Sequence, residues 1–178
     1  TLGIVGLGGT GIEVAKRAQG FEMYTIAVDT EDLEIPPFVR SVWPMERFND
    51  LLRESDVVSI CAPLTAKTEK MFNYAAFQQM KPHALLINVT RGRIVDGPDL
   101  IRALNEGLIG GAGLDVTPEE PLPLDNPLWD MPNVIVTPHV AGGSPIRLDR
   151  TIDLFCQSLE LFMNNNTLLS VIDKYKGY

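Results

Sequence analysis

The sequence has little cysteine, few basic residues and no long apolar run. Its two cysteines, Cys61 and Cys156, have no paired spacing, which argues against a disulfide framework and for reduced, buried thiols. No apolar segment approaches the roughly 18 residues of a membrane-spanning helix, and no basic region opens the chain as in a signal peptide. We therefore expect a cytoplasmic protein without a membrane partner.

The charge balance argues against further classes of binding partner. The chain carries 15 Lys and Arg against 23 Asp and Glu, and its formal net charge is −8 at pH 7. Nucleic acid and anionic membranes require a basic face, so neither is an expected partner. A small anion held by a local site is compatible with this charge, and no metal site is expected.

What the sequence does contain is a regular alternation of short apolar runs with helical patterns. The strand-like runs are apolar almost throughout, which is typical of parallel strands covered on both faces. The alternation predicts an α/β fold of the Rossmann type, a doubly wound parallel sheet in three αβα layers. Residues 117–132 hold five prolines and are expected to form a long loop. Strands are expected at 2–6, 24–29, 56–61, 84–89, 111–116 and 133–137, and helices at 10–20, 45–55, 74–80, 98–107 and 145–164.

The first turn of this pattern has the chemistry of a pyrophosphate site. Residues 6–11 read G-x-G-x-x-G between a strand and a helix, and a second strand ends at Asp29, close to the roughly 20-residue spacing of dinucleotide sites. Gly6 permits the tight turn, Gly8 lets the backbone approach the anion, and Gly11 lets helix and strand pack closely. Amides at the helix start attract the anion. Asp29 would accept hydrogen bonds from ribose hydroxyls and repel a 2′-phosphate, so the predicted cofactor is NAD.

A second group of residues follows the carboxyl ends of predicted strands, where open α/β sheets bind ligands. His139 can move a proton near neutral pH from that position, although the position suits a structural histidine equally well. Arg91 offers a planar guanidinium for a carboxylate, or else lies on the surface without a role. Glu119 and Glu120 lie in the proline-rich loop, and spacing does not decide which of them would hold the imidazole.

Together these residues resemble the nucleotide-binding domain of the D-isomer-specific 2-hydroxyacid dehydrogenases. The resemblance implies an NAD-dependent oxidoreductase that interconverts a D-2-hydroxy acid and its 2-keto acid, with a phosphoglycerate-, glycerate- or lactate-like substrate. It implies that Arg91 binds the substrate carboxylate, that Glu120 pairs with His139, and that His139 is the general acid and base. The matching segments are 6–11, 56–68, 80–96 and 113–142, which span nearly the whole chain.

The resemblance also divides the chain and assigns its cofactor contacts. Residues 1–144 would form an NAD-binding Rossmann domain, and 145–178 a C-terminal helix and arm that return toward a substrate domain whose N-terminal part is absent. Members of the family pair through their nucleotide-binding domains, so a homodimer is expected. The implied cofactor contacts are Gly6, Gly8, Gly9, Thr10, Gly11, Asp29, Cys61, Pro63, Thr68, Val89, Thr90, Arg91, Asp115, His139 and Gly142.

Two positions depart from the family pattern, and one alternative function stays open. Many members have histidine at the position of Cys61, and arginine or asparagine at that of Gly9, so the contact at Gly9 would be reduced to backbone. The alternative is a dinucleotide-sensing binding module, as in the corepressor members of the family. Residues 1–178 alone are expected to bind NAD(H) without turnover, because one wall of the substrate cleft would be missing.

Overall fold

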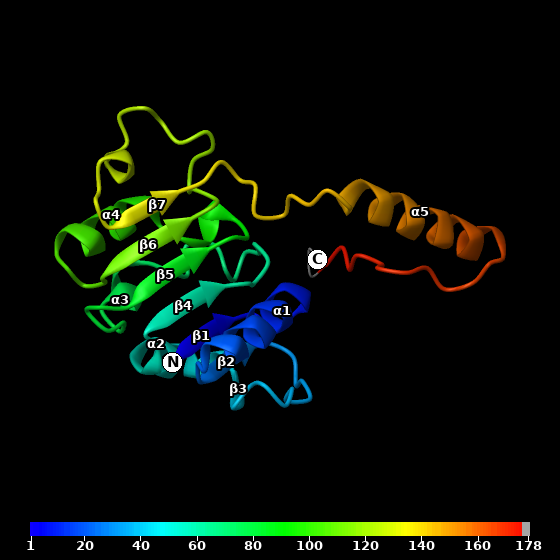
Figure 1. Ribbon diagram of the computed structural model, residues 1–178, viewed down its shortest axis with the longest axis horizontal. Coiled ribbons are helices and arrows are strands. Elements are labelled where there is room, and N and C mark those ends of the chain that lie inside the picture. Colours follow the sequence, from blue (N-terminus) through cyan, green and yellow to red (C-terminus); the bar gives the residue numbers. More distant parts are fainter. Residues whose placement is uncertain (176–178) are drawn as a thin grey trace. The chain divides into compact units, whose positions relative to one another are not determined.

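The computed structural model describes residues 1–175 and divides the chain into two compact units, Thr1–His139 and Val140–Tyr178 (Figure 1). The last three residues of the expected C-terminal arm, 176–178, lie outside the described residues.

The first unit is built on one sheet of seven parallel strands in the order β3-β2-β1-β4-β5-β6-β7. The order reverses at β1, with β2 on one side and β4 on the other, as in a doubly wound sheet. The Rossmann-type prediction is therefore confirmed. The strands are β1 (Leu2–Val5), β2 (Thr25–Asp29), β3 (Ser41–Pro44), β4 (Val57–Ile60), β5 (Leu85–Asn88), β6 (Gly111–Leu114) and β7 (Val134–Val136).

Strand β3 was not expected from the sequence. It is a four-residue segment, Ser-Val-Trp-Pro, that is only half-buried, lacks the continuous apolar run of the inner strands and ends in a proline. Proline cannot donate to a sheet ladder and is therefore confined to edges or strand ends. Pro44 meets both conditions, because β3 is the edge strand beside β2 and Pro44 is its last residue.

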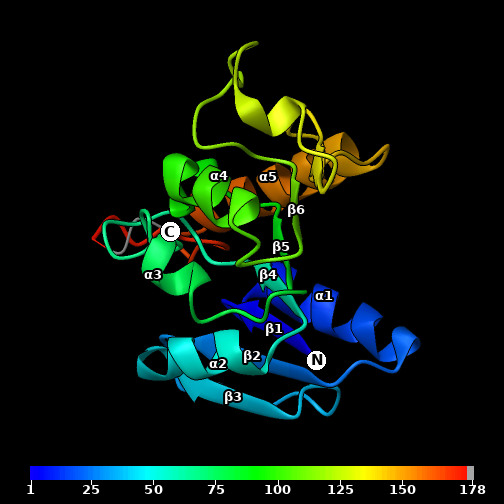
Figure 2. The same ribbon diagram turned by 90° about the vertical axis from the view of Figure 1, so that its left-hand side faces the viewer.

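Helices cover both faces of the sheet, which completes the three layers (Figure 2). On one face, Ala15 and Ala18 of α1 (Gly9–Ala18) pack with Leu2 and Ile4 of β1. The other face is covered by α2 (Phe48–Glu54), α3 (Tyr74–Phe77) and α4 (Gly97–Asn105). Its larger core includes Val5, Ile60, Leu86, Leu51, Leu52, Phe72, Phe77 and Leu100, all completely buried. Short 3-10 turns lie at Gln19–Phe21, Met45–Arg47, Gly92–Ile94 and Pro127–Trp129.

Local sequence signals explain where α4 begins and ends. The side chain of Asp96 accepts a hydrogen bond from the backbone N–H of Asp99 at 3.2 Å, which caps the first turn. Pro98 occupies that first turn, where its missing N–H has no helical partner to lose. Gly107 follows the last turn with φ +69°, a left-handed conformation that stops the helix.

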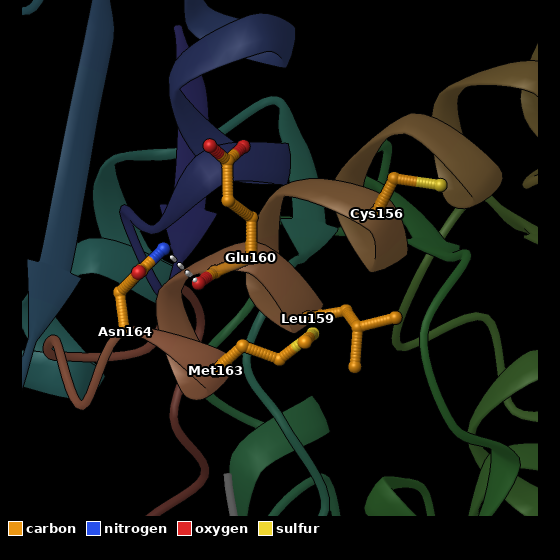
Figure 3. Close-up of a pocket in the computed structure, with 5 residues that line it drawn as sticks. All are labelled: Cys156, Leu159, Glu160, Met163 and Asn164. Carbon is orange, nitrogen blue, oxygen red and sulfur yellow. Dashed lines mark hydrogen bonds between the residues drawn. The ribbon is translucent and has the colours of Figure 1, made fainter.

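The second unit consists of helix α5 (Arg147–Met163) and an extended segment after it. The side-chain amide of Asn164 donates to the carbonyl of Glu160 at 2.9 Å and closes the last turn (Figure 3). Apolar side chains of α5 are exposed in a stripe of helical spacing that includes Ile152 and Phe155. Cys156 is exposed on the same helix, so the expectation that both thiols are buried is wrong for this one. Within residues 1–175 no helix is long and apolar enough to cross a membrane.

A cluster of charges lies at the amino ends of the central strands, at the edge opposite the carboxyl ends of the strands. The carboxylate of Asp56 accepts a hydrogen bond from Lys81 Nζ at 2.8 Å. His83 Nε2 lies 2.9 Å from the same carboxylate. These contacts, with Lys81 the largest contributor, hold the pKa of Asp56 well below its usual range.

We expect Asp56→Asn to lower the free energy of unfolding at pH 7 by about 1 kcal/mol or less, because the side chain is 39% exposed and its ion pairs are screened. The native pKa is depressed, so the ionised carboxylate stabilises the fold above the unfolded-state pKa of roughly 4. That contribution is lost as the pH falls. The difference between variant and wild type should therefore shrink below pH 4 in urea unfolding. A difference independent of pH, or an equal effect from the exposed control Asp32→Asn, would contradict this assignment.

Candidate functional site

The turn after β1, residues 6–11, is named the phosphate turn, and its backbone requires glycine at two positions. Gly6 adopts φ +91°, a left-handed conformation that side chains disfavour. A Cβ placed on Gly11 would lie 2.2 Å from the carbonyl oxygen of Gly6, so only glycine fits between α1 and the turn. A Cβ on Gly8 or Gly9 would meet nothing within 4 Å, which leaves the outer side of the turn open.

The open side of the turn fits a pyrophosphate. Helix α1 begins at Gly9, and no side chain of the described residues caps it, so its first amides remain available to a ligand. Those amides and the helix dipole attract an anion. The turn therefore fits the pyrophosphate of a dinucleotide, and the predicted contacts at Gly8, Gly9 and Thr10 remain predictions.

Asp29, at the end of β2, has a structural task that the sequence did not reveal. Its Oδ2 accepts a hydrogen bond from the backbone N–H of Leu7 at 2.7 Å, inside the phosphate turn. Its Oδ1 accepts from the N–H of Glu31 at 3.0 Å. The half-exposed carboxylate thus ties β2 to the turn and faces solvent beside it. The predicted contact with the ribose hydroxyls remains a prediction.

Arg91 is presented by a turn that Asn88 builds. Asn88 is the last residue of β5 and is 1% exposed. Its Nδ2 donates to the carbonyl of Arg91 at 3.0 Å, and its Oδ1 accepts from the N–H of Thr90 at 3.1 Å. The guanidinium of Arg91 is exposed, donates to the Thr90 carbonyl at 2.7 Å, and has no carboxylate partner among residues 1–175. It is available to an anion from solution.

His139 follows β7 in a left-handed conformation, with φ +54°. Its backbone N–H donates to the carbonyl of Asp115 at 2.9 Å, which fixes the residue against the end of β6. Its Nδ1 lies 3.2 Å from Oε2 of Glu120. The structure therefore brings Glu120 to the imidazole and gives Glu119 no such contact, an alternative that spacing had left open.

The loop that carries Glu120 is held from two sides. Thr117 donates its backbone N–H to Oε1 of Glu120 at 3.2 Å and its hydroxyl to the carbonyl of Glu119 at 2.6 Å. A Cβ on Gly92 would lie 1.7 Å from the carbonyl oxygen of Thr117. The Arg91 turn and the Glu120 loop are thus in backbone contact.

Backbone hydrogen bonds also join the ends of β5, β6 and β7. The N–H of Asp115 donates to the carbonyl of Asn88 at 2.9 Å, and the Asp115 carbonyl accepts from His139. The buried carboxylate of Asp115 accepts from the hydroxyl of Thr137 at 2.6 Å. These bonds place the end of each strand at one edge of the sheet.

The remaining expected contacts lie around the same edge or in the second unit. Cys61 follows β4 half-buried, and burial raises the pKa of its thiol, which favours the neutral form. Thr68 donates its hydroxyl to the carbonyl of Pro63 at 2.7 Å, so these two residues close one loop. Val89 belongs to the turn after β5, whereas Gly142 belongs to the second unit. Among residues 1–175 no group of three or more His, Cys, Asp or Glu side chains is arranged to hold a metal ion.

Sequence reasoning missed Asn88, Gly92, Thr117 and Thr137. The spacing Thr-x-x-Glu from Thr117 to Glu120 is one signal that could have been used, since a glutamate three residues after a threonine often reaches back to its N–H. Asn88 is another, since an asparagine often bonds to the backbone two residues ahead, as it does here to Thr90. Gly92 and Thr137 act through tertiary contacts, which no local pattern predicts.

Comparison with known proteins identifies the family of the chain. Residues 1–141 match the family described as the D-isomer specific 2-hydroxyacid dehydrogenase, NAD binding domain. The chain belongs to this family. It is 43% identical to the glyoxylate reductase of Korarchaeum cryptofilum over 165 residues, which cover 91% of this chain and 48% of the relative. The chain therefore spans about half the length of such relatives.

Two solved structures share the fold along nearly the whole chain. The NADPH-dependent glyoxylate/hydroxypyruvate reductase of Sinorhizobium meliloti, in complex with NADP and sulfate, superposes with a TM-score of 0.92 at 30% identity, covering 99% of this chain and 56% of that one. The D-lactate dehydrogenase of Lactobacillus jensenii, with NAD+, gives 0.83 at 30% identity, covering 97% and 55%. A nicotinamide dinucleotide is thus the cofactor class of the family, and its members use both forms.

Gly11 and Gly8 of the phosphate turn should respond differently to substitution by alanine. Gly11→Ala is expected to lower the free energy of unfolding by about 2 kcal/mol or more, because the new methyl group overlaps the Gly6 carbonyl. Gly8→Ala should cost less than about 1 kcal/mol. It should nevertheless weaken NADH binding, because the methyl group enters the open side of the turn. Urea unfolding and NADH fluorescence titration measure the two effects, and equal destabilisation by both variants would contradict the assignment.

Proposed function

We propose that the chain is the nucleotide-binding and acid–base part of an NAD-dependent oxidoreductase that interconverts a D-2-hydroxy acid and its 2-keto acid. The observation that supports this most is the Glu120–His139 pair, held at the sheet edge that also carries Arg91. Relatives named glyoxylate reductase and glycerate dehydrogenase favour a small substrate of this class.

Each residue of the proposed site has a task that its surroundings permit. The bound nicotinamide supplies or accepts the hydride. Arg91 holds the substrate carboxylate with its free guanidinium, which matches two oxygens at once. His139, hydrogen-bonded to Glu120 through Nδ1, keeps Nε2 free to donate a proton to the substrate oxygen, or to accept one in the reverse direction. Glu120 fixes the tautomer and balances the charge of the imidazolium.

We further propose NAD as the preferred form of the cofactor. The proposal rests on Asp29, whose carboxylate lies beside the phosphate turn and would repel a 2′-phosphate. The next residues, Thr30, Glu31 and Asp32, contain no arginine that could bind such a phosphate. Relatives with the same fold bind NAD or NADP, so the fold does not indicate which form is preferred. The acidic character of residues 29–32 is the feature that favours NAD.

The division of the chain belongs to the same proposal. Residues 1–144 would bind the cofactor, while 145–178 would return toward a substrate domain, and two copies would pair through their nucleotide-binding parts. The exposed apolar stripe of α5 supports a role for this segment in packing. The boundary between the two structural units lies slightly earlier in the sequence, between His139 and Val140.

The proposed activity is tested on the protein in its full natural length, by following NADH absorbance with glyoxylate, hydroxypyruvate, pyruvate and larger 2-keto acids. Turnover of at least one acid is expected. NADH binding without turnover of any of them would overturn the enzyme and favour the dinucleotide-sensing module. Residues 1–178 alone should bind NADH but turn over little, since water exclusion around the reacting atoms requires a second wall.

Asp29 should set the cofactor preference. Asp29→Ala is expected to weaken NADH binding by about 10- to 100-fold, because a hydrogen bond to a charged group contributes ~1.5–3 kcal/mol. The same substitution should reduce the difference between the affinities for NADH and NADPH. Asp29→Asn is the matched control, since its amide oxygen can still accept from the N–H of Leu7 while the charge is gone. Fluorescence titration measures both cofactors, and equal wild-type affinities would rule out the assignment.

His139 should carry the proton. His139→Gln is expected to lower kcat by about 10²- to 10⁴-fold, the usual value of general acid–base catalysis. Glu120→Gln should lower it by a smaller factor, because the imidazole remains but loses its charged partner. His83→Gln, which changes the histidine at the opposite end of the sheet, is the control and should leave kcat unchanged. A near-wild-type rate for His139→Gln would contradict the mechanism.

Arg91 should act on substrate binding and on the reaction itself. Arg91→Lys keeps the charge but loses the planar pair of donors. We expect a higher KM for the keto acid and a lower kcat, with kcat/KM reduced about 10-fold or more, in line with the ~1.5–3 kcal/mol of a charged hydrogen bond. Unchanged steady-state kinetics would return Arg91 to an ordinary surface position. Arg93→Lys serves as the control, because that side chain is engaged with Glu69.

A further inference from the structure

We propose that Thr117 is a positioning residue that orients the carboxylate of Glu120 and, through it, the imidazole of His139. The inference deepens the proposed function and rests on it. In this role Thr117 contacts neither substrate nor cofactor. Its effect is transmitted by hydrogen bonds within the loop that follows β6.

Thr117 closes a turn in the loop that follows β6. The residue is 6% exposed, so its hydroxyl is largely removed from water and needs a partner in the protein. That partner is the carbonyl of Glu119, at 2.6 Å. This bond draws residue 119 back over Thr117 and so sets the position of the next residue, Glu120.

The two carboxylate oxygens of Glu120 have different hydrogen-bond partners. Oε1 accepts from the backbone N–H of Thr117 at 3.2 Å, and Oε2 lies 3.2 Å from Nδ1 of His139. The side chain of Glu120 is 41% exposed, so water competes for both oxygens. With Oε1 anchored on the backbone, rotation of the carboxylate is restricted and Oε2 stays directed at the imidazole.

The backbone of Thr117 is held in place by its contact with Gly92. Its carbonyl oxygen lies where a Cβ of Gly92 would be, at 1.7 Å, so the chain at Thr117 is pressed against the Arg91 turn. Thr117 therefore cannot drift without moving the turn that Asn88 holds. A loop residue anchored on both sides in this way can transmit an orientation to Glu120.

The experiment compares Thr117→Val, which keeps the shape but removes the hydroxyl, with Thr117→Ser, which restores it. The first readout is the imidazole ¹⁵N–¹H spectrum, which reports the tautomer and partner of each histidine. The chain has two histidines, and His83 at the Asp56 cluster serves as internal reference. Thr25→Val is the matched control, because Thr25 is buried and its hydroxyl has no partner among the described residues.

We expect Thr117→Val to move the His139 signals in the direction seen for Glu120→Gln while the His83 signals stay in place. Thr117→Ser should return them to the wild-type position, and Thr25→Val should leave them unchanged. In the keto-acid assay, Thr117→Val should lower kcat roughly 5- to 10-fold, the effect of one lost hydrogen bond, without changing KM. A purely structural threonine would lower stability alone.

A folded Thr117→Val protein whose His139 signals match the wild type would overturn the positioning role. If that variant does not fold, Thr117→Cys takes its place, since a thiol is a much weaker donor, and wild-type His139 signals there would overturn the role equally. A wild-type protein that reduces no keto acid would instead overturn the proposed function. The spectra still decide the positioning role in that case, so the two failures are distinguishable.

Discussion

The common direction of the strands is the constraint on which the candidate site depends. Because the sheet is parallel throughout, the turns that follow β1, β5, β6 and β7 emerge at the same edge. The ladder also continues past the strands, through the bonds from Asp115 to Asn88 and from His139 to Asp115. Residues from distant parts of the chain therefore take their spacing from the register of the sheet rather than from flexible loops.

Several polar residues at this edge contribute to the fold and to the proposed chemistry at once. Asp29 holds the phosphate turn through Leu7, and its half-exposed carboxylate faces solvent beside that turn. Asn88 is buried to shape the turn that leaves Arg91 exposed. Substitutions at such positions change stability and binding together, so the two effects must be measured separately before either is assigned.

The sequence predicted what local chemistry determines. The order of the six expected strands and of the helices between them, and the glycine turn, follow from periodicity and from residue types at fixed spacing, and the structure has them. The choice between Glu119 and Glu120 could not be predicted, because both are adjacent carboxylates and a tertiary contact selects one. Strand β3 was missed because it lacks the continuous apolar run of the inner strands, and only its pairing with β2 identifies it.

The contact between Gly92 and the carbonyl of Thr117 has a consequence for protein engineering. The two loops meet at backbone atoms, so neither can be lengthened, shortened or given a side chain at that point without displacing the other. A redesign that grafts a new segment after β5 while keeping the native segment after β6 would separate Arg91 from the Glu120–His139 pair. Residues 88–97 and 115–121 are better exchanged together, as a single cassette.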